Sequence, residues 1–507
     1  MTSALLTPLL ALFAAACGMS LILTPVARLA ARRCGFVDRP DGRRKLHVEA
    51  VPLAGGLAIL AAGTLALLLA FALPGPLAAA LAPRARTLAG LLLGALVIAD
   101  VGVADDFRLL RSRHKLLGQV VAALIVMGSG VRIDHLRLFG WDVNLGALAV
   151  PFTLFWLLGA INALNLLDGM DGLLSSVGLI VSLTLAVMAG MERDWAGAAV
   201  AVALAGSVLG FLHYNLPPAR IFLGDCGSML IGLVVGVLAI QSSLKGPATV
   251  ALAAPAALFI LPILDTAAAI VRRKLTGRSI YTTDRGHLHH CLQHRGLSSR
   301  GALLVVAGLS LVAAGGALAS LVLNSEVLAV LAAVSVATVL VVTRLFGRAE
   351  LMLVQKRVAS VAAALLARSG RSSRELSVRL HGSADWAPVW LRLTELAERL
   401  NLQSVRLAVN APALMEEYHA RWERAGESID ERPLWRVEVP LADGGQSVGR
   451  VEITGRPDDE SVALKLASVA RLLADVEATL AHLALRRRAP APDAPRPRAA
   501  APEPATR

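Results

Sequence analysis

The sequence predicts an all-α bundle that spans a membrane about eleven times, followed by a small cytosolic α/β domain. The bundle is predicted by composition, because 56% of the 507 residues are hydrophobic and the mean hydropathy is +0.63, whereas soluble domains are roughly 45–50% apolar. The second domain is predicted by a change of pattern after Val342, where charged residues recur every few positions. We expect residues 1–345 to be membrane-embedded, 346–488 to form the α/β domain, and 489–507 to be a disordered tail.

The membrane spans are predicted from long apolar runs. A spanning helix needs about 20 mostly apolar residues. Eleven runs meet this rule, centred near Ala16, Gly63, Gly94, Ala122, Phe155, Val181, Leu204, Val234, Phe259, Ala313 and Leu331. Several are rich in Gly and Ala, which favours close helix packing. The first run is too long for a signal-peptide core and lacks a basic n-region, so we expect it to stay as an anchor.

The basic residues predict the orientation of the bundle. One alternating set of connections carries 19 Lys and Arg and the other carries 6, and the positive-inside rule places the richer set in the cytoplasm. The N-terminus is then periplasmic and the C-terminal region cytoplasmic. Because most basic residues before Thr343 lie between apolar runs, the net charge of +13 does not indicate nucleic-acid binding. The four cysteines form no C-x-x-C pair, which argues against a zinc cluster or a disulfide framework.

The polar clusters of the membrane region all fall on the predicted cytoplasmic side. They are residues 39–47 with 52–56, 105–106 with Lys115, 162–172, 224–228 and 284–290. Carboxylates beside apolar helix ends are costly unless they are paired, hydrated or bound to a cation. Oxygen ligands favour a hard cation such as Mg²⁺, which combines one or two carboxylates with water and substrate phosphates. The shared side therefore predicts a site for Mg²⁺, or Mn²⁺ in its place, and a diphosphate.

Each cluster also has a structural interpretation when it is taken alone. Residues 105–106 suit a helix end at the membrane interface, and residues 168–172 suit a tight turn with Asx chemistry. Residues 224–225 suit a helix cap. The histidines in 287–290 suit phosphate binding better than a transition-metal site, and a solvated loop is a third interpretation.

Two motifs then identify a family. Residues 162–173, NALNLLDGMDGL, and 222–232, FLGDCGSMLIG, resemble those of the polyprenyl-phosphate N-acetylhexosamine-1-phosphate transferases of glycosyltransferase family 4. This group includes the bacterial undecaprenyl-phosphate GlcNAc-1-phosphate transferase. The resemblance covers about residues 5–345 and includes every cluster in family order. It departs at the far end, because about 160 residues follow the last span, whereas the core enzymes end soon after it.

The resemblance implies roles for individual residues. Asp225 and Asn165 are expected to be the protein ligands of Mg²⁺, with the catalytic Asp168 beside them. Asp105 and Asp106 resemble an essential catalytic pair near the lipid phosphate. Lys115 is expected to face a phosphate and Asp171 to contact the uracil. The sugar diphosphate is expected to be contacted by Arg285, His287, His289 and His290. The remaining expected substrate-binding residues are Asn162 and, in the first cytoplasmic loop, Lys45 and His47.

The implied reaction is attack by an undecaprenyl phosphate oxygen on the β-phosphorus of a UDP-N-acetylhexosamine, releasing UMP at the bacterial inner membrane. A phosphate monoester is largely dianionic at neutral pH. We therefore expect Asp105 and Asp106 to position the acceptor or relay a proton rather than act mainly as a base, and a covalent aspartyl-phosphate route is less favoured. Membrane lipid, a second copy of the chain and a cytosolic protein at the C-terminal domain are further expected partners.

Two rival functions remain open. The phospho-MurNAc-pentapeptide transferases share the aspartate motifs but carry three consecutive histidines, whereas Leu288 interrupts the run here, which favours the GlcNAc branch. A secondary transporter also combines many spans with acidic residues. It would place ionisable groups near mid-membrane, often within internal repeats, and no repeat is visible in this sequence.

The region after Arg348 has an alternating pattern with no catalytic constellation. Strands are predicted at Leu376 to Leu380, Val405 to Val409, Trp435 to Val439 and Ser447 to Ile453, with a hairpin turn at Asp443-Gly-Gly. Amphipathic helices are predicted at Trp386 to Leu400, Ala411 to Ala425 and Glu460 to Leu485, after a helical stretch that ends near Ser369. Regulation or protein docking is the expected role.

Overall fold

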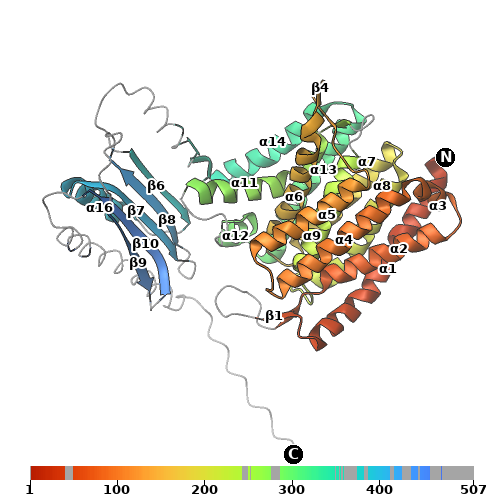
Figure 1. Cartoon of the computed structure of the whole chain (residues 1–507), viewed down its shortest axis with the longest axis horizontal. Coiled ribbons are helices and arrows are strands. Elements are labelled where there is room, and N and C mark those ends of the chain that lie inside the picture. The colour runs from red at the N-terminus through yellow and green to blue at the C-terminus, as the bar shows by residue number, and fades with distance from the viewer. Residues whose placement is uncertain are drawn as a thin grey trace, which may run out of the picture. The chain divides into compact units, whose positions relative to one another are not determined.

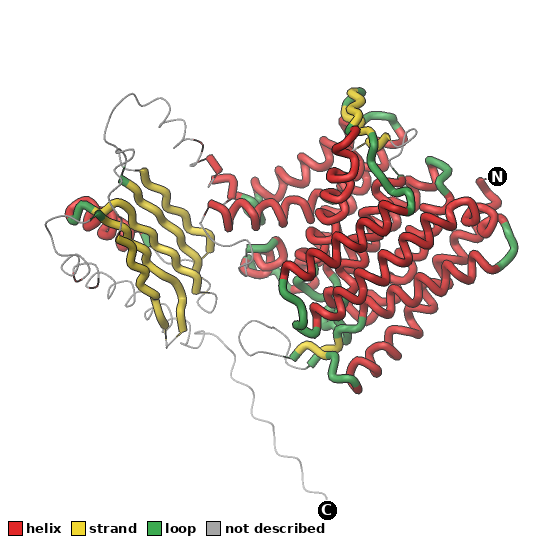
Figure 2. Tube along the Cα trace, viewed as in Figure 1, coloured by secondary structure: helices red, strands yellow, loops and turns green. Residues whose placement is uncertain are grey.

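The computed structural model describes residues 2–39, 50–242, 249–251, 253–275, 286–348, 350–352, 354–355, 358, 374–381, 386–411, 416–424, 435–443, 446–456, 467 and 470. The chain divides into two compact units. The first, called here the membrane unit, comprises Met1–Arg273 and Ser279–Arg348, and the second contains the remaining residues. Figure 2 shows that the membrane unit is built from helices and that the second unit contains a sheet.

Helices make up most of the membrane unit (Figure 1). In chain order they are α1 (Thr2–Arg33), α2 (Gly55–Ala72), α3 (Pro76–Leu81), α4 (Ala85–Asp106), α5 (Ser112–Gly128), α6 (Ala149–Leu167), α7 (Leu173–Met191), α8 (Trp195–Asn215), α9 (Gly224–Gln241), α10 (Ala253–Leu258), α11 (Ile260–Leu275), α12 (Leu288–His294), α13 (Ser299–Val322) and α14 (Glu326–Val342). Short 3₁₀ turns precede α4 at Ala82–Arg84 and α6 at Gly146–Leu148.

Eight of the described helical segments are long and apolar enough to cross a membrane. They correspond to α1, α2, α3 with α4, α6, α7, α8, α9 and α13. Three other predicted spans are represented by shorter helices, since α5 and α14 have 17 residues each and the run centred near Phe259 is broken between α10 and α11. The prediction of a multi-span helical protein is confirmed, and the number eleven and the orientation stay predictions.

Large apolar side chains on the outside of the helices fit this membrane class. Ile22 of α1 is 69% exposed, Phe155 of α6 is 71% exposed and Leu304 of α13 is 69% exposed. Soluble monomers rarely expose contiguous apolar surface of this kind. By contrast, 83% of the apolar stretch of α9 is buried inside the unit, against 28% for α1. Helix α9 is therefore a central helix of the bundle.

Glycines let the neighbouring helices reach the backbone of α9. A Cβ added to Gly56 of α2 would lie 2.2 Å from the amide nitrogen of Gly227, and one added to Gly102 of α4 would lie 2.3 Å from Cα of Cys226. On α9 itself, a Cβ at Gly232 would lie 2.7 Å from Cα of Ile161 in α6. Small residues at such crossings allow this approach. As a result, the ends of α2, α4 and α6 are held close to the first turns of α9.

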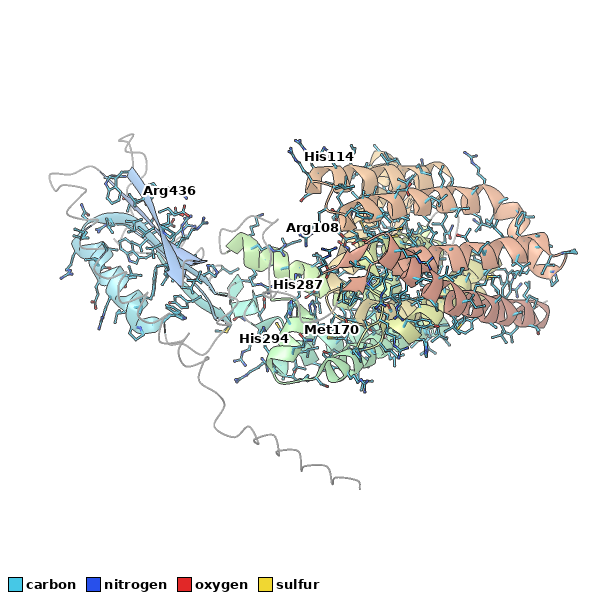
Figure 3. The ribbon with its side chains drawn as sticks, turned by 90° about the horizontal axis from the view of Figure 1, so that it is seen from below. Arg108, His114, Met170, His287, His294 and Arg436 are labelled. Carbon is cyan, nitrogen blue, oxygen red and sulfur yellow. The ribbon has the colours of Figure 1, made fainter. Side chains whose placement is uncertain are left out.

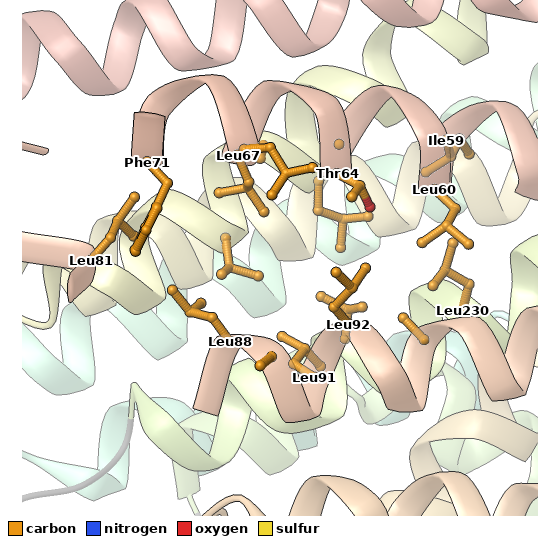
Figure 4. A pocket seen from close by; sticks show the side chains of 18 of the residues that line it. Ile59, Leu60, Thr64, Leu67, Phe71, Leu81, Leu88, Leu91, Leu92 and Leu230 are labelled. Carbon is orange, nitrogen blue, oxygen red and sulfur yellow. The ribbon is translucent and has the colours of Figure 1, made fainter. Parts of the chain in front are cut away.

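An apolar cavity of about 280 Å³ lies farther along the same helices. Figure 4 shows Leu67 of α2 and Leu91 of α4 on opposite sides of it, with Leu230 of α9 at one end. None of the aspartates discussed below lines this cavity. The contacts of Gly56 and Gly102 with α9 lie between the cavity and the polar ends of the helices, so the cavity belongs to the apolar part of the bundle.

Short strands accompany the helices. Strands β1 (Val37–Asp38) and β2 (Val51–Pro52) pair antiparallel between α1 and α2. Strands β3 (His135–Leu138) and β4 (Trp141–Asn144) form an antiparallel pair, and β5 (Thr249–Ala251) joins β3 in parallel. These strands are not predicted from the sequence, because each has only two to four residues, which is too short for a periodic pattern to be recognised.

The second unit contains an antiparallel sheet of five strands in the order β6-β8-β7-β10-β9. Its elements are β6 (Arg374–His381), α16 (Ala387–Arg399), β7 (Leu402–Ala411), β8 (Glu416–Glu423), β9 (Trp435–Asp443) and β10 (Gln446–Gly455). The core is formed by one face of α16 with inward residues of the strands, including Trp390, Leu407 and Ile453. The four predicted strands lie within β6, β7, β9 and β10, and Gln446 pairs with Asp443 as the predicted hairpin requires.

The predicted helix from Ala411 to Ala425 is wrong, because the described part of this segment forms the end of β7 and the whole of β8. Tyr418, Ala420 and Trp422 alternate at a period of two and are all buried. The Glu, Ala and Arg residues of this segment favour a helix locally, but pairing with β6 and β7 on both sides outweighs this propensity. Most of the predicted helix from Glu460 to Leu485, and the tail from residue 489, lie outside the described residues.

Candidate active site

Three helix ends from distant parts of the membrane unit bring the polar motifs of the sequence together. Asp105 and Asp106 are the last two residues of α4, Asp225 is the second residue of α9, and Asn165 lies in the last turn of α6. The close glycine contacts of α9 with α4 and α6 explain why these ends meet. The aspartate clusters are therefore assembled by helix packing in one place rather than spread around the bundle.

Lys115 lies at the centre of this group. It projects from the first turn of α5, and its Nζ is 2.8 Å from Oδ2 of Asp105 and 3.0 Å from Oδ2 of Asp225. The same ammonium group donates to Oδ1 of Asn165 at 3.2 Å. Because the Lys115 side chain is only 17% exposed, these charged contacts are better shielded from solvent than an ordinary surface ion pair. The oxygens of three elements thus converge on one positive charge.

Asn165 fixes the orientation of the Asp225 carboxylate. Its Nδ2 donates to Oδ1 of Asp225 at 2.7 Å and to Oγ of Ser228 at 2.8 Å. This leaves the amide oxygen of Asn165 and Oδ2 of Asp225 turned toward Lys115. The amide and the carboxylate therefore present oxygen atoms to the same point, which is the arrangement that a bound cation requires.

Asp106 caps the start of α9. Its Oδ1 accepts a hydrogen bond from the backbone N–H of Asp225 at 3.0 Å, and its Oδ2 accepts from the N–H of Cys226 at 3.4 Å. Both N–H groups belong to the first turn of α9, where no intrahelical acceptor exists. Gly224 has a φ of +73°, and a Cβ there would lie 2.6 Å from Oδ2 of Asp106, so only glycine fits. Asp106 thereby holds Asp225 in place.

Asp168 and Asp171 lie in the turn that follows α6. Burial, together with the charges of Asp225, Asp106 and Asp171, raises the pKa of Asp168 well above its ordinary value. An ionised Asp168 therefore requires additional positive charge nearby. Asp171 accepts a hydrogen bond from the backbone N–H of Ala219 at 2.9 Å, which ties the turn to the loop after α8.

The histidine segment packs against this turn. The ring of His289 lies over Gly169, where a Cβ would come within 2.1 Å of Cε1. Gln293 of α12 contacts Sδ of Met170 at 3.3 Å, and Figure 3 shows Met170 and His287 at the same end of the helices. The segment that begins at His287 is thus placed directly beside the residues that surround Asp168.

His289 is a buried and neutral side chain. It is 3% exposed, and burial, with the neighbouring His290 and His287, lowers its pKa well below the ordinary value. Neither of its ring nitrogens makes a hydrogen bond within the described structure. An imidazole with two unused polar atoms beside Gly169 can donate one hydrogen bond and accept another.

The remaining predicted substrate contacts are placed as follows. Asn162, one turn before Asn165, makes reciprocal amide hydrogen bonds with Gln119 of α5, at 2.8 and 3.3 Å. The ring of His290 lies 4.2 Å from that of His289, measured between centroids. Lys45, His47 and Arg285 lie outside the described residues.

Two side chains of this region are not among the predicted site residues. Ser228 was quoted within its motif but not as a site residue, although it bonds to Asn165. Asp265 of α11 was hidden in an apolar run, and the structure places it at 2.9 Å from Nδ1 of His287 with 1% exposure. A lone carboxylate within an apolar stretch is itself a signal of a functional position. That signal could have identified Asp265.

The donor set fits a hard divalent cation. Within the described residues there is no group of three or more His, Cys, Asp or Glu side chains arranged to hold a metal ion, so a closed transition-metal site is not built here. Carboxylate oxygens of Asp225 and Asp105 and the amide oxygen of Asn165 converge on one point instead. Magnesium commonly binds through one or two carboxylates, with water and substrate phosphates as its other ligands.

Fold and site together define a multi-span membrane enzyme with an acidic site where its helices end. The model of glycosyl transferase family 4 matches residues 88–243. The chain is 34% identical over 288 residues to a probable undecaprenyl-phosphate N-acetylglucosaminyl 1-phosphate transferase of Bacillus subtilis, covering 56% of this chain and 77% of the relative. The chain therefore belongs to glycosyl transferase family 4, as its motifs predicted.

Two further relatives sample different branches of this family. A decaprenyl-phosphate N-acetylglucosaminephosphotransferase of Mycolicibacterium smegmatis is 36% identical over 304 residues, which cover 55% of this chain and 74% of the relative. A phospho-N-acetylmuramoyl-pentapeptide-transferase of Moorella thermoacetica is 32% identical over 289 residues, with coverage of 54% and 86%. The aligned lengths correspond to little more than half of this chain.

Proposed function

We propose that the chain transfers N-acetylhexosamine-1-phosphate, first of all GlcNAc-1-phosphate, from a UDP-sugar to undecaprenyl phosphate, releasing UMP and initiating synthesis of a cell-envelope polysaccharide. The observation that carries the proposal is the convergence of Asp105, Asp225 and Asn165 on the ammonium group of Lys115 where apolar helices end. A mixed site of anionic and cationic groups suits a reaction between two phosphates. The activities named for the relatives above support the same chemistry.

Asp225 and Asn165 would hold the Mg²⁺, because their oxygens already face one point and Asn165 orients the carboxylate. Bound there, Mg²⁺ would neutralise charge on the diphosphate of the donor. Lys115 would contribute a second positive charge once phosphates enter the site, since its ammonium can exchange a carboxylate oxygen for a phosphate oxygen. Asp106 acts through α9, by keeping Asp225 at this position.

In the proposed reaction an acceptor phosphate oxygen bonds to the β-phosphorus of the donor, and the bond from that phosphorus to the bridging oxygen of UMP breaks. Phosphoryl transfer depends mainly on positioning and charge stabilisation. The acceptor is already largely dianionic, so Asp105 has no need to remove a proton and instead holds Lys115 in position. His289 offers a neutral donor beside Gly169 for an oxygen of the diphosphate.

The membrane setting supports the choice of a lipid acceptor. The site residues sit at the ends of helices, so a lipid phosphate at the interface can reach them while the nucleotide arrives from the aqueous side. We propose that this side is the cytoplasm and the membrane the bacterial inner membrane, because the connections on this side carry most of the Lys and Arg.

The test is release of UMP by purified protein supplied with undecaprenyl phosphate, Mg²⁺ and a panel of UDP-sugars. We expect UDP-GlcNAc to give UMP and lipid-linked product in equal amounts, and Asp225→Asn to reduce the rate at least 100-fold. A preference for UDP-MurNAc-pentapeptide would assign the chain to the other branch. Full activity of Asp225→Asn, with an unchanged Mg²⁺ requirement, would refute the metal assignment.

A further inference from the structure

Helix α11 carries two buried charged side chains that the proposed reaction does not use. Asp265 and Arg272 are each 1% exposed and lie seven residues apart, which places them on the same side of the helix. The rest of the α11 sequence before Arg272 is almost entirely apolar. Burying a carboxylate in such surroundings is strongly unfavourable unless its hydrogen bonds are supplied. The structure supplies them from one segment of the chain.

That segment is the start of the histidine run. Oδ2 of Asp265 lies 2.9 Å from Nδ1 of His287, and Oδ1 of Asp265 accepts the backbone N–H of Leu288 at 2.8 Å. One carboxylate therefore binds both the first histidine ring and the first N–H of α12. The His287 side chain is 10% exposed, so the contact is shielded from water.

Arg272 supports the same segment two turns farther along α11. A Cβ added to Gly286 would lie 2.2 Å from Cζ of Arg272, so the backbone before His287 runs directly over the guanidinium group. A side chain at this position would require the guanidinium group of Arg272 to move. Asp265 and Arg272 together form a surface on α11, called here the α11 clamp, against which residues 286–288 rest.

The contact with Asp265 decides which ring nitrogen of His287 is available. An ionised carboxylate only accepts hydrogen bonds, so Nδ1 must carry the proton of this contact. Nε2 is then the free nitrogen, and it can donate to a phosphate oxygen when the ring is an imidazolium. The same bond fixes the orientation of the ring.

We infer that Asp265 is a positioning residue for the diphosphate: it sets the tautomer and orientation of His287 so that Nε2 faces the donor, and the α11 clamp holds the histidine segment against the Asp168 turn. This inference rests on the proposed function for the identity of the anion. The contacts that carry it are the two hydrogen bonds of Asp265 and the Gly286 approach to Arg272. His289 over Gly169 is the second point at which the segment is held.

A double-mutant cycle tests this inference. We expect Asp265→Asn and His287→Gln each to lower kcat/KM for the UDP-sugar at least tenfold, with the KM for undecaprenyl phosphate changed less than twofold. Because Asp265 acts through His287, the double variant should be no worse than His287→Gln alone. Asp265→Glu should recover part of the activity. Thr266→Val, at the next position of α11, is the matched control and should retain the wild-type rate.

The opposing outcomes are distinct. The inference is refuted if the effects of the two substitutions on kcat/KM multiply. It is also refuted if Asp265→Asn lowers the Tm enough to account for the lost activity, because Asp265 would then stabilise the fold rather than position His287. An inactive wild type with every donor would refute the proposed function instead. In that case ¹⁵N spectra of histidine-labelled protein, with His287→Gln used for assignment, still decide: we expect protonated Nδ1 in the wild type, and loss of this signal in Asp265→Ala. Nδ1 without a proton in the wild type would overturn the inference.

Discussion

Replacing Lys115 by methionine should make the protein bind a divalent cation more tightly while it loses activity. The ammonium group lies within 3.2 Å of oxygens from Asp105, Asp225 and Asn165, and these are the oxygens that we assign to the cation. Methionine keeps the length and the apolar stem of the side chain but removes the charge. The lysine and the cation therefore compete electrostatically in the absence of substrate, and cooperate only when phosphates separate them.

The expected size of the effect follows from the charges. A single charge and a double charge about 5 Å apart repel each other by about 1.7 kcal/mol even at the dielectric constant of water, and by more in a partly buried site. Lys115 is 17% exposed and Asp225 31% exposed, so the water value is a lower bound. This energy corresponds to at least about tenfold tighter binding in Lys115→Met. Activity should fall about 100-fold or more, because the donor phosphates lose one of their cations.

The assay is titration of purified protein with Mn²⁺, followed by electron paramagnetic resonance, without nucleotide. Arg113→Met is the matched control, because Arg113 lies on the same helix, is exposed and removes the same charge. We expect its affinity for Mn²⁺ to stay within about twofold of the wild type. Unchanged or weaker Mn²⁺ binding by Lys115→Met would refute the assignment of these oxygens to a cation.

Three further predictions concern the supports of the site. Gly169→Ala should displace His289, since the new Cβ would lie 2.1 Å from its Cε1. We expect a loss of about 1–3 kcal/mol in the free energy of unfolding and reduced UMP release. Gly159→Ala, at a site with open space, should behave as wild type. Asp106→Ala should cost about 1–2 kcal/mol by uncapping α9, and Asp106→Asn should recover most of this in thermal unfolding; equal losses in both variants would contradict the cap. The depressed pKa of His289 means that the folded state resists protonation of this ring. Stability that is present above about pH 6.5 should therefore be lost as the pH falls, by at most about 1.4 kcal/mol per pH unit. The Tm of His289→Gln should fall less than that of the wild type between pH 7 and pH 5, and parallel plots of Tm against pH for the two proteins would refute this explanation.

The spans and polar motifs could be predicted because each of them is encoded by a continuous stretch of the sequence. Apolar runs locate the helices, and clusters at their ends, such as 105–106 and 224–228, locate candidate site residues. The pairing of these clusters could not be predicted from local pattern, because it depends on glycines of different helices meeting the backbone of α9. The family resemblance supplied that grouping instead. It gave roles to residues but did not reveal that Lys115 joins Asp105, Asp225 and Asn165.

Asp265 and strand β8 illustrate the two kinds of failure. Asp265 was overlooked because its apolar neighbours made the run look like an ordinary span, whereas its partner His287 lies 22 residues away. Strand β8 was assigned to a helix because its residue types favour one. Its pairing with β6 and β7, and the place of Tyr418, Ala420 and Trp422 in the core, show that it is a strand. In both cases a long-range contact outweighed a local pattern.

The central claim is that aspartates gathered at the helix ends hold a divalent cation against the diphosphate of a nucleotide. The most direct measurement is the ³¹P hyperfine coupling of Mn²⁺ bound to the protein with UDP-GlcNAc present. The account predicts a coupling from phosphate oxygens bound to the metal, and its loss in Asp225→Ala at the same Mn²⁺ concentration. A wild-type complex without ³¹P coupling, or a coupling that Asp225→Ala leaves intact, would contradict the account.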